Sequence, residues 1–267
     1  MVAKPVLDRD RYGPWAVIAG GSDGTGAAFA RDVAASGINL LLVARRQGPL
    51  DTLAEELRQA HGIEVRTLSL DLNTPDAARR IAQAVDDKEV GLYISNAGAE
   101  KGGHGFLDTP LDTIHGLIAR NVLTVADACH IFGGAMVKRG RGGVVLMGSG
   151  AGLGGQPGVA AYSGVKAFVL NLAESLWAEW RGKGVDVIGI AAPIMETPTL
   201  RETLGTMVIP GIYQAADVAR TALERLPDRG PCYVYPLDPS PVEAERQSDA
   251  RRERVLAVEA ITASLFH

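Results

Sequence analysis

The sequence contains few cysteines and no excess of basic charge. Its two cysteines, Cys129 and Cys232, are too few for a disulfide scaffold or a cysteine-ligated zinc site. Its 27 basic and 31 acidic residues give a net charge of −4, so no basic excess is available to hold a nucleic-acid backbone or an anionic membrane. The five histidines are not paired at metal-ligand spacing, and we expect no metal site.

Long apolar runs are also missing. The run from Ile38 to Ala44 is one of the longest, and it falls far short of a membrane span. Residues 1–11 are charged and lack an apolar core, so they do not read as a secretory signal. By contrast, 46% of the residues are apolar and 22% are charged, which is enough to bury a sizeable core. The composition therefore predicts a soluble, cytoplasmic, folded protein.

Short apolar runs recur along the chain and predict a parallel sheet. Most are continuous rather than alternating, as in strands whose two faces are both covered by helices. Segments with helical spacing lie between them, such as the one that carries Leu50, Leu53 and Leu57. This alternation predicts an α/β fold, with a doubly wound parallel sheet of about seven strands and helices on both faces. The expected strands are 15–19, 39–44, 65–70, 92–95, 144–147, 185–191 and 233–235.

The glycine- and proline-rich stretches do not divide the chain into domains. Residues 98–105, 148–158 and 193–210 are too short and too apolar to be interdomain linkers, so we expect one domain over residues 1–267. Residues 239–267 predict a C-terminal helical extension. Its apolar stripe, which usually packs on the same domain or on a partner subunit, consists of Val255, Val258, Ile261 and Leu265.

A glycine cluster follows the first expected strand. Gly20, Gly24 and Gly26 precede an expected helix over residues 27–35. Glycines let the chain turn tightly and let a pyrophosphate approach the backbone, while the helix N-terminus supplies unpaired N–H groups. A strand before and a helix after form the context that a dinucleotide site requires. The alternative is a loop that needs only flexible residues. The dinucleotide interpretation includes Ser22, Asp23 and Thr25 of the same loop.

Tyr162 and Lys166 form the most informative pair. Their spacing places both on one helix face, so that an ammonium can lie close to a phenol. A free phenol has a pKa near 10, and acid–base work near neutrality requires this value to fall by roughly two to three units, or ~3–4 kcal/mol. A nearby cation and the charge of a nicotinamide can together supply this. Alone, such a pair usually means an exposed lysine beside a packed tyrosine. Other motifs in the sequence must therefore support a catalytic role for the pair.

These motifs resemble the short-chain dehydrogenase/reductase family, in its short single-domain branch. The resemblance rests on the spacing Gly20-x-x-x-Gly24-x-Gly26, on Tyr162 with Lys166, and on Ser149 thirteen residues earlier, and it covers about residues 12–235. It implies a Rossmann-type NAD(P)-binding domain and an oxidoreductase that interconverts a secondary alcohol and a ketone. The catalytic residues that it implies are Asn121, Ser149, Tyr162 and Lys166. Three positions depart from the family pattern, namely Ala19, Ser95 and Ile194.

The expected cofactor is NADP(H) rather than NAD(H). Arg45 and Arg46 lie about twenty residues after the glycines, where a carboxylate would bind a free ribose 2′-hydroxyl. A guanidinium there can bind a 2′-phosphate through two hydrogen bonds. Asp23 in the glycine loop is evidence against NADP(H), because some NADP-using members of the family carry a basic residue there. The alternative is that both arginines are solvated surface charges. The resemblance adds Asp71 and Leu72 at the adenine, Asn96, Ala97 and Gly98 along the ribose, and Pro193 and Thr197 at the nicotinamide, with Tyr162 and Lys166.

Apolar side chains near these motifs predict a hydrophobic substrate, such as a steroid, an acyl chain or an aromatic ketone. The expected substrate residues are Ser149, Leu153, Val159, Ile194, Leu200, Leu204 and Met207, and residues 198–212 form the expected substrate loop. His104 either lines the substrate pocket or is only a polar loop residue, and we expect the second.

The resemblance also implies a homodimer or homotetramer. Trp177 and Trp180 lie either at the subunit contact or within the monomer. The alternative functions are a non-catalytic dinucleotide-binding regulator or subunit, and epimerisation on the same scaffold.

Overall fold

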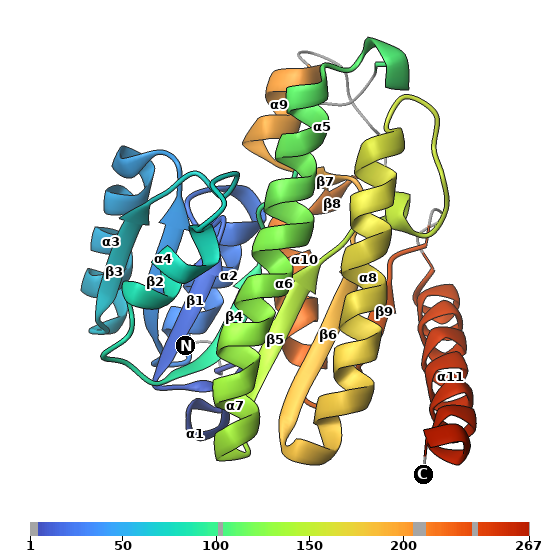
Figure 1. Cartoon of the computed structure of the whole chain (residues 1–267). Helices are drawn as coiled ribbons and strands as arrows, with labels where there is room; N and C mark the ends of the chain where they lie inside the picture. The colour runs from blue at the N-terminus through green and yellow to red at the C-terminus, as the bar shows by residue number, and fades with distance from the viewer. Residues whose placement is uncertain (1–4, 101–103, 205–211, 237–239, 267) are drawn as a thin grey trace.

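A seven-stranded parallel sheet forms the centre of the protein (Figure 1). The computed structural model describes residues 5–100, 104–204, 212–236 and 240–266. The strand order is β3-β2-β1-β4-β5-β6-β9, so the chain winds outward in both directions from β1 and β4. The strands are β1 (Trp15–Ala19), β2 (Asn39–Ala44), β3 (Val65–Ser69), β4 (Val90–Ser95), β5 (Gly142–Met147), β6 (Val185–Ala191) and β9 (Cys232–Val234).

The prediction of a doubly wound α/β fold is confirmed. All seven expected strands are present, and the differences are one or two residues at some strand ends. A second, two-stranded sheet of β7 (Met195–Glu196) and β8 (Tyr213–Gln214) was not expected. Each of its strands has two residues, which is too short to show a period-2 pattern.

Helices cover both faces of the sheet (Figure 1). One face is covered by α2 (Gly24–Ala35), α3 (Gln47–His61) and α10 (Ala215–Arg225). The other is covered by α4 (Ala77–Gln83), by the long helix from α5 (Leu111–Ile118) to α7 (Gly134–Arg139), and by α8 (Ala160–Trp180). The remaining short helices are α1 (Arg9–Tyr12), η1 (Phe106–Asp108), η4 (Gly150–Gly152), η5 (Arg181–Lys183) and α9 (Pro198–Leu204).

The continuous apolar strands have a direct structural reason. Every residue of β1 is buried. Ala16 and Ile18 belong to the core beneath α2, α3 and α10, whereas Trp15, Val17 and Ala19 belong to the core beneath α4, the long helix and α8. Successive side chains of a strand point to opposite faces, so both faces must be apolar when helices cover both.

The long helix from α5 to α7 contains two π turns. The segment η2 (Ala119–Leu123) follows α5, and η3 (Cys129–Gly133) follows α6 (Thr124–Ala128). A π turn adds one residue to a helical turn and often occurs at functional sites. The first of these turns contains Asn121, one of the catalytic residues that the resemblance implies.

The expected C-terminal extension is the helix α11 (Pro241–Phe266), which lies along β9 and α8 (Figure 1). Polar contacts attach it to the domain: the Ser248 hydroxyl accepts a bond from the backbone N–H of Val234 at 3.0 Å, and Arg251 pairs with the buried Glu174. The expected apolar stripe is only partly the docking face, because Val255 packs against the core whereas Val258 and Ile261 are exposed. The side chain of Leu265 lies outside the described ones.

Both tryptophans of α8 contact other parts of the chain. Trp177 is buried, with the Arg181 guanidinium 4.4 Å from its ring. The Trp180 ring lies against Gly133, where an added Cβ would come within 2.3 Å of it. Both rings therefore pack within the monomer. Among the described residues, no helix combines the length and the apolar character needed to cross a membrane.

Candidate functional site

The expected glycine loop forms a tight turn at the carboxyl end of β1. Gly20 has a φ of +89°, and a Cβ there would lie 2.6 Å from the backbone nitrogen of Ala97. A Cβ on Gly26 would lie 1.8 Å from the carbonyl oxygen of Gly20, which in turn accepts a bond from the side-chain amide of Asn96 at 2.9 Å. Only glycine fits at these two positions. The structure thus joins the loop after β1 to the loop after β4, as a backbone cradle at the N-terminus of α2.

Asp23 has two partners at this cradle. Its carboxylate caps α2 by accepting the backbone N–H of Gly24 at 2.8 Å, and it pairs with Arg46 at 3.2 Å. Both charged side chains are exposed. Arg45 is also exposed, directly after β2. A cavity of about 730 Å³ lies between the starts of α2 and α3; its lining includes Ser22, Asp23, Gly24 and Arg46. The remaining loop residue, Thr25, is buried and contacts Met195.

The loop after β3 is shaped by Asp71. Its carboxylate accepts the backbone N–H of Asn73 at 3.0 Å, which closes a turn. Asp71 is therefore not a helix cap, because α4 begins only at Ala77. Leu72 is buried, and its carbonyl accepts a bond from the Thr124 hydroxyl at 2.9 Å. The exposed carboxylate and the backbone of this pair lie just beyond the carboxyl end of β3.

Ser149, Tyr162 and Lys166 meet at the carboxyl end of β5. Ser149 begins the short helix η4 and accepts the backbone N–H of Ala151 at 3.2 Å. The Tyr162 hydroxyl lies within hydrogen-bonding reach of the Ser149 side chain, which lowers the pKa of the phenol. The Nζ atom of Lys166 lies 5.7 Å from the centroid of the Tyr162 ring and donates to the carbonyl of Met147 at 2.9 Å. Lys166 is buried rather than exposed, so the usual alternative for such a pair does not hold.

The ionisation of this pair differs from the expectation that a lysine cation lowers the pKa of the phenol. Burial is the largest effect and raises the pKa of Tyr162 above its usual value, while the hydrogen bond with Ser149 and the charge of Arg120 lower it. Burial also lowers the pKa of Lys166 to about 7, so Lys166 is only partly charged near neutrality. The protein alone therefore keeps Tyr162 protonated.

Asn121 lies beside the buried amine. Its side-chain amide donates to the carbonyl of Leu117 at 3.0 Å, while its Oδ1 atom is buried without a hydrogen-bond partner in the described structure. A Cβ on Gly98 would lie 2.1 Å from this Oδ1 and 2.8 Å from Lys166 Nζ. A buried carbonyl oxygen with no protein partner is a natural position for an ordered water. The arrangement therefore fits a proton path through Asn121 to Lys166.

The segment after β6 reaches back to the glycine loop. Pro193 is half-buried, two residues beyond the end of β6. A Cβ on Gly24 would lie 3.2 Å from the Thr197 methyl group, and the Thr197 hydroxyl accepts the backbone N–H of Leu200 at 3.2 Å. Thr197 thus packs against the cradle at the start of α9. The structure brings together the expected cofactor residues of five strand ends.

The expected substrate residues are less well assembled. Leu153 and Ile194 are exposed, while Val159 and Leu200 are half-buried. Met207 and the side chain of Leu204 lie outside the described residues, as does much of the expected substrate loop. His104 is exposed.

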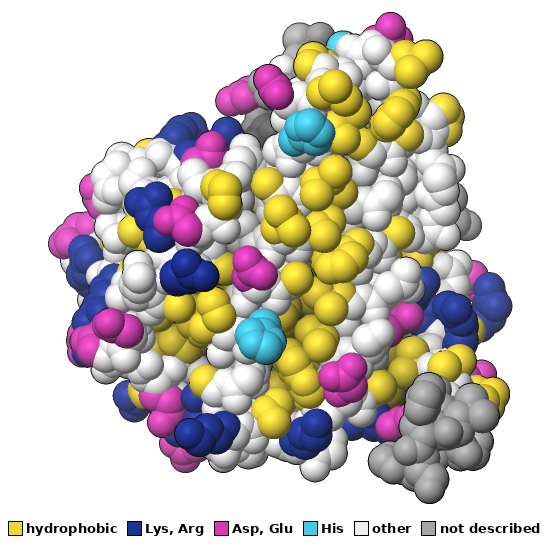
Figure 2. Space-filling view, viewed as in Figure 1, with side chains coloured by type: hydrophobic (Ala, Val, Ile, Leu, Met, Phe, Trp, Pro, Cys, Tyr) yellow, Lys and Arg dark blue, Asp and Glu magenta, His cyan; other side chains and the backbone are white. Residues whose placement is uncertain are grey.

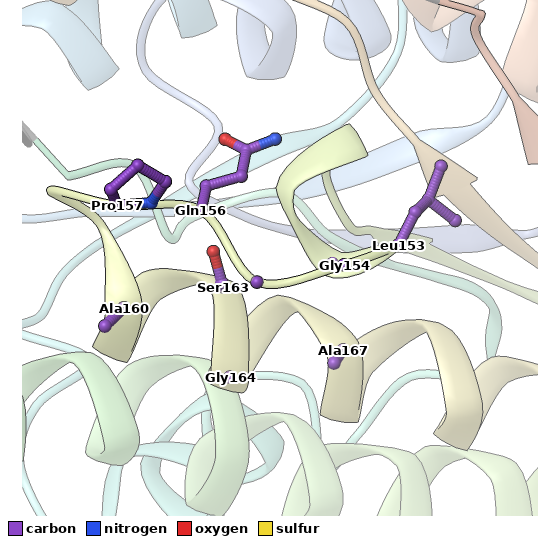
Figure 3. A pocket seen from close by; sticks show the side chains of 10 residues that line it. Leu153, Gly154, Gln156, Pro157, Ala160, Ser163, Gly164 and Ala167 are labelled. Carbon is purple, nitrogen blue, oxygen red and sulfur yellow. The ribbon is translucent and has the colours of Figure 1, made fainter.

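Leu153 lines a cavity of about 650 Å³ between the glycine-rich loop and α8. In Figure 3 this loop, with Gln156 and Pro157, runs over α8, and the Ser163 hydroxyl points toward it. Neither Ser149 nor Tyr162 lines this cavity.

Two charged residues at the site were missed in the sequence. Arg120 and Glu100 form an ion pair at 3.0 Å between η2 and the loop after β4. The available signal was the position of Arg120, directly before Asn121 in a helix expected to carry a catalytic side chain. Among the described residues, no group of three or more potential metal ligands is present.

Comparisons with known proteins agree with this geometry. A family model described as short chain dehydrogenase matches residues 14–207. A 7β-hydroxysteroid dehydrogenase of Collinsella aerofaciens is 32% identical over 215 residues, which cover 80% of this chain and 80% of that protein. A very-long-chain 3-oxoacyl-CoA reductase of Neurospora crassa is 33% identical over 211 residues, or 76% of this chain. The match covers only 63% of that reductase.

Solved structures show the same fold. A short-chain dehydrogenase from Sphingobium yanoikuyae in complex with NADPH superposes with a TM-score of 0.80 and 28% sequence identity. The superposition covers 90% of this chain and 94% of that one.

Proposed function

This chain belongs to the short-chain dehydrogenase/reductase family, and on that premise we propose that it interconverts a secondary alcohol and a ketone with NADP(H). Family membership makes it an oxidoreductase; the reaction, the cofactor preference and the substrate are the proposal. The observation that carries it is the contact of Tyr162 with both Ser149 and Lys166 at the carboxyl edge of the sheet. Ligands of doubly wound folds bind at this edge.

The roles of the side chains follow from their positions. When bound, NADPH would supply the hydride for the carbonyl carbon, and NADP⁺ would bring a positive nicotinamide charge. Ser149 would hold the substrate oxygen by a hydrogen bond. Tyr162 would donate a proton to that oxygen during reduction and accept it during oxidation. Lys166 would bind the nicotinamide ribose. Together with Asn121, it would also return a proton to Tyr162 after each reduction.

The proton balance explains why a raised pKa of Tyr162 is compatible with this role. In the reductive direction the protonated phenol is the required form, because the ketone gains a hydride and a proton. Oxidation of the alcohol requires the phenolate, whose formation the nicotinamide charge of NADP⁺ favours. Ser149 also lowers the pKa of Tyr162, and so favours the phenolate as the nicotinamide charge does.

Preference for NADP(H) is supported by Arg45 and Arg46. Both side chains are exposed directly after β2, and Arg46 lines the cavity between α2 and α3. A 2′-phosphate there would receive charge-assisted bonds from either residue. Arg46 already forms an ion pair with Asp23, so we assign the larger contribution to phosphate binding to Arg45. The relative from Sphingobium yanoikuyae, described in complex with NADPH, supports the same choice.

We assign a hydrophobic ketone or alcohol as the substrate class. The relatives named above are a 7β-hydroxysteroid dehydrogenase and a very-long-chain 3-oxoacyl-CoA reductase, whose names refer to a steroid and to a long acyl chain. The exposed Ile194 side chain directly follows Pro193, beside the expected nicotinamide position. A steroid, an acyl chain or an aromatic ketone therefore forms the first set to test.

Assembly into a homodimer or homotetramer is also part of the proposal. A hydrophobic stripe runs down the face formed by the long helix and α8 (Figure 2). Its exposed members on the long helix are Leu111, Ile118, Leu123 and Ile131. Stripes of this kind mark contact surfaces, and a second copy of the chain would bury them. Leu123→Lys should then lower the oligomeric state measured by light scattering. A cytoplasmic location remains a prediction from the sequence.

The direct test is NADPH oxidation with a panel of hydrophobic ketones, with NADP⁺ and the matching alcohols as the reverse arm. We expect turnover with at least one bulky ketone and a weaker rate with NADH. Cofactor binding without turnover across the panel would favour the regulator instead. Redox-neutral inversion of a hydroxyl centre would favour an epimerase.

A further inference from the structure

Arg120 brings a charge to the proposed active site that the sequence motifs do not assign. It lies in η2, one residue before Asn121, and therefore shares the π turn of that residue. Its Nη2 atom donates to the carbonyl of Ala99 at 3.1 Å and to Oε2 of Glu100 at 3.0 Å. The pair is largely buried, with 19% of the Arg120 side chain and 24% of the Glu100 side chain exposed.

The segment held by Arg120 borders two catalytic side chains. Ala99 and Glu100 directly follow Gly98, which touches both Asn121 Oδ1 and Lys166 Nζ closely enough that a Cβ could not be added. A shift of this segment would therefore change the space between the amide oxygen and the amine. Arg120 fixes the segment from the same helical turn that carries Asn121.

Arg120 also reaches the loop expected at the adenine. Its Nη1 atom lies 3.5 Å from Oδ1 of Asn73, and four residues later the Thr124 hydroxyl donates to the carbonyl of Leu72 at 2.9 Å. The long helix thereby holds the loops after β3 and β4 together. This places Arg120 between the two ends of the proposed cofactor site.

The charge of Arg120 acts on the reacting groups as well. A guanidinium stays protonated throughout the range in which proteins fold, whereas burial lowers the pKa of Lys166 to about 7. Among the described residues, the charged groups that face Tyr162 are Lys166 on α8, Arg120 on η2 and Glu100 after β4. Arg120 lowers the pKa of Tyr162, and Glu100 raises it.

We propose that Arg120, paired with Glu100, is a positioning residue of the active site: it fastens residues 98–100 beside Asn121 and Lys166, and it keeps a permanent positive charge close to Tyr162. This inference rests on the proposed function, in which Tyr162 is the acid–base group. Arg120 and Glu100 then act on Tyr162 with opposite signs. A purely structural ion pair would instead affect both variants in the same way.

The test is a titration of Tyr162 in four proteins: wild type, Arg120→Gln, Arg120→Lys and Glu100→Gln. Tyrosinate absorbance is followed over the pH range in which circular dichroism is constant. Each protein is compared with its own Tyr162→Phe version, so that only this phenol is seen. We expect the midpoint to rise in Arg120→Gln, to fall in Glu100→Gln, and to stay near wild type in Arg120→Lys.

The matched control is Arg66→Gln, which breaks a similar ion pair with Asp87 at 2.7 Å on the far edge of the sheet. It should leave the Tyr162 midpoint unchanged. Midpoints that move together in Arg120→Gln and Glu100→Gln, or that do not move within the accessible range, overturn the inference.

The pH profile of kcat for ketone reduction gives a second readout, and its limb should shift in the same opposite directions. Absence of turnover in the wild type would contradict the proposed function, whereas the absorbance titration would still decide the role of Arg120.

Discussion

Lys166 faces the ring of Tyr162 from one turn further along α8, with its Nζ atom 5.7 Å from the ring centroid and 2.9 Å from the carbonyl of Met147. The amine is therefore anchored to the end of β5, the strand that also positions Ser149. Since burial lowers the pKa of Lys166 to about 7, this amine can bind and release a proton near neutrality. It is suited to proton transfer as well as to electrostatic support.

Replacement of the phenol tests its role as the acid–base group. Tyr162→Phe keeps the ring and its packing but removes the exchangeable proton. We expect kcat to fall by about 10²- to 10⁴-fold, the usual contribution of general acid–base catalysis. NADPH binding, measured by fluorescence titration, should stay nearly unchanged. Tyr233→Phe in β9 is the control and should keep full turnover. Retained activity in Tyr162→Phe would remove this residue from the mechanism.

The buried Lys166 predicts a pH-dependent stability. Its folded pKa is about 7, below the usual value of 10.5 that applies to the unfolded chain. Between these values the unfolded state binds more protons, so the free energy of unfolding rises with pH from about 7 toward 10.5, by at most about 1.4 kcal/mol per pH unit. Below pH 7 the cost of burying the ammonium is fully present.

Urea denaturation at several pH values checks this prediction. Lys166→Met removes the titrating group, so the rise between neutral and alkaline pH should be smaller than in wild type. Lys138→Met changes an exposed lysine on α7 and should leave the wild-type slope intact. An identical slope in wild type and Lys166→Met would show that Lys166 does not titrate in this range.

The two arginines after β2 predict the cofactor preference. Arg45→Asp should weaken the binding of NADPH by about 10- to 100-fold, which corresponds to the loss of one charge-assisted hydrogen bond of about 1.5–3 kcal/mol. NADH has no 2′-phosphate and should be affected far less. Asp23→Asn should have the opposite effect. It removes the carboxylate that pairs with Arg46 at 3.2 Å, so NADPH should bind more tightly. Equal losses for both cofactors in Arg45→Asp would show that Arg45 does not touch the phosphate.

Much of the fold was predictable because burial on both faces leaves a clear pattern. The strands β1, β2 and β6 match the expected residues, since their apolar runs end at loop residues. Gly20 and Gly26 were predictable because the turn they form excludes any side chain. The pair β7–β8 was not, because two-residue strands depend on contacts made elsewhere in the chain.

The site was predictable in its parts more than in its electrostatics. The positions of Tyr162, Lys166 and Ser149 follow from helix and strand geometry. The pKa of Tyr162 does not, because it depends on burial and on charges such as Arg120, which comes from a different element. Leu153 is a similar case: its side chain lines a cavity against α8, and the sequence does not tell which side of its loop faces the catalytic residues.

Gly98 provides a steric test of the site that does not alter any charge. Its φ of +154° and the positions of Asn121 Oδ1 and Lys166 Nζ leave no room for a Cβ. Gly98→Ala must displace the amide or the amine, and we expect a large loss of kcat together with a stability loss of about 1–3 kcal/mol. Gly182→Ala is the matched control, because a Cβ there meets nothing within 4 Å. Kinetics and thermal unfolding should therefore separate the two alanines; equal behaviour would mean that residues 98–100 can move without affecting Asn121 and Lys166.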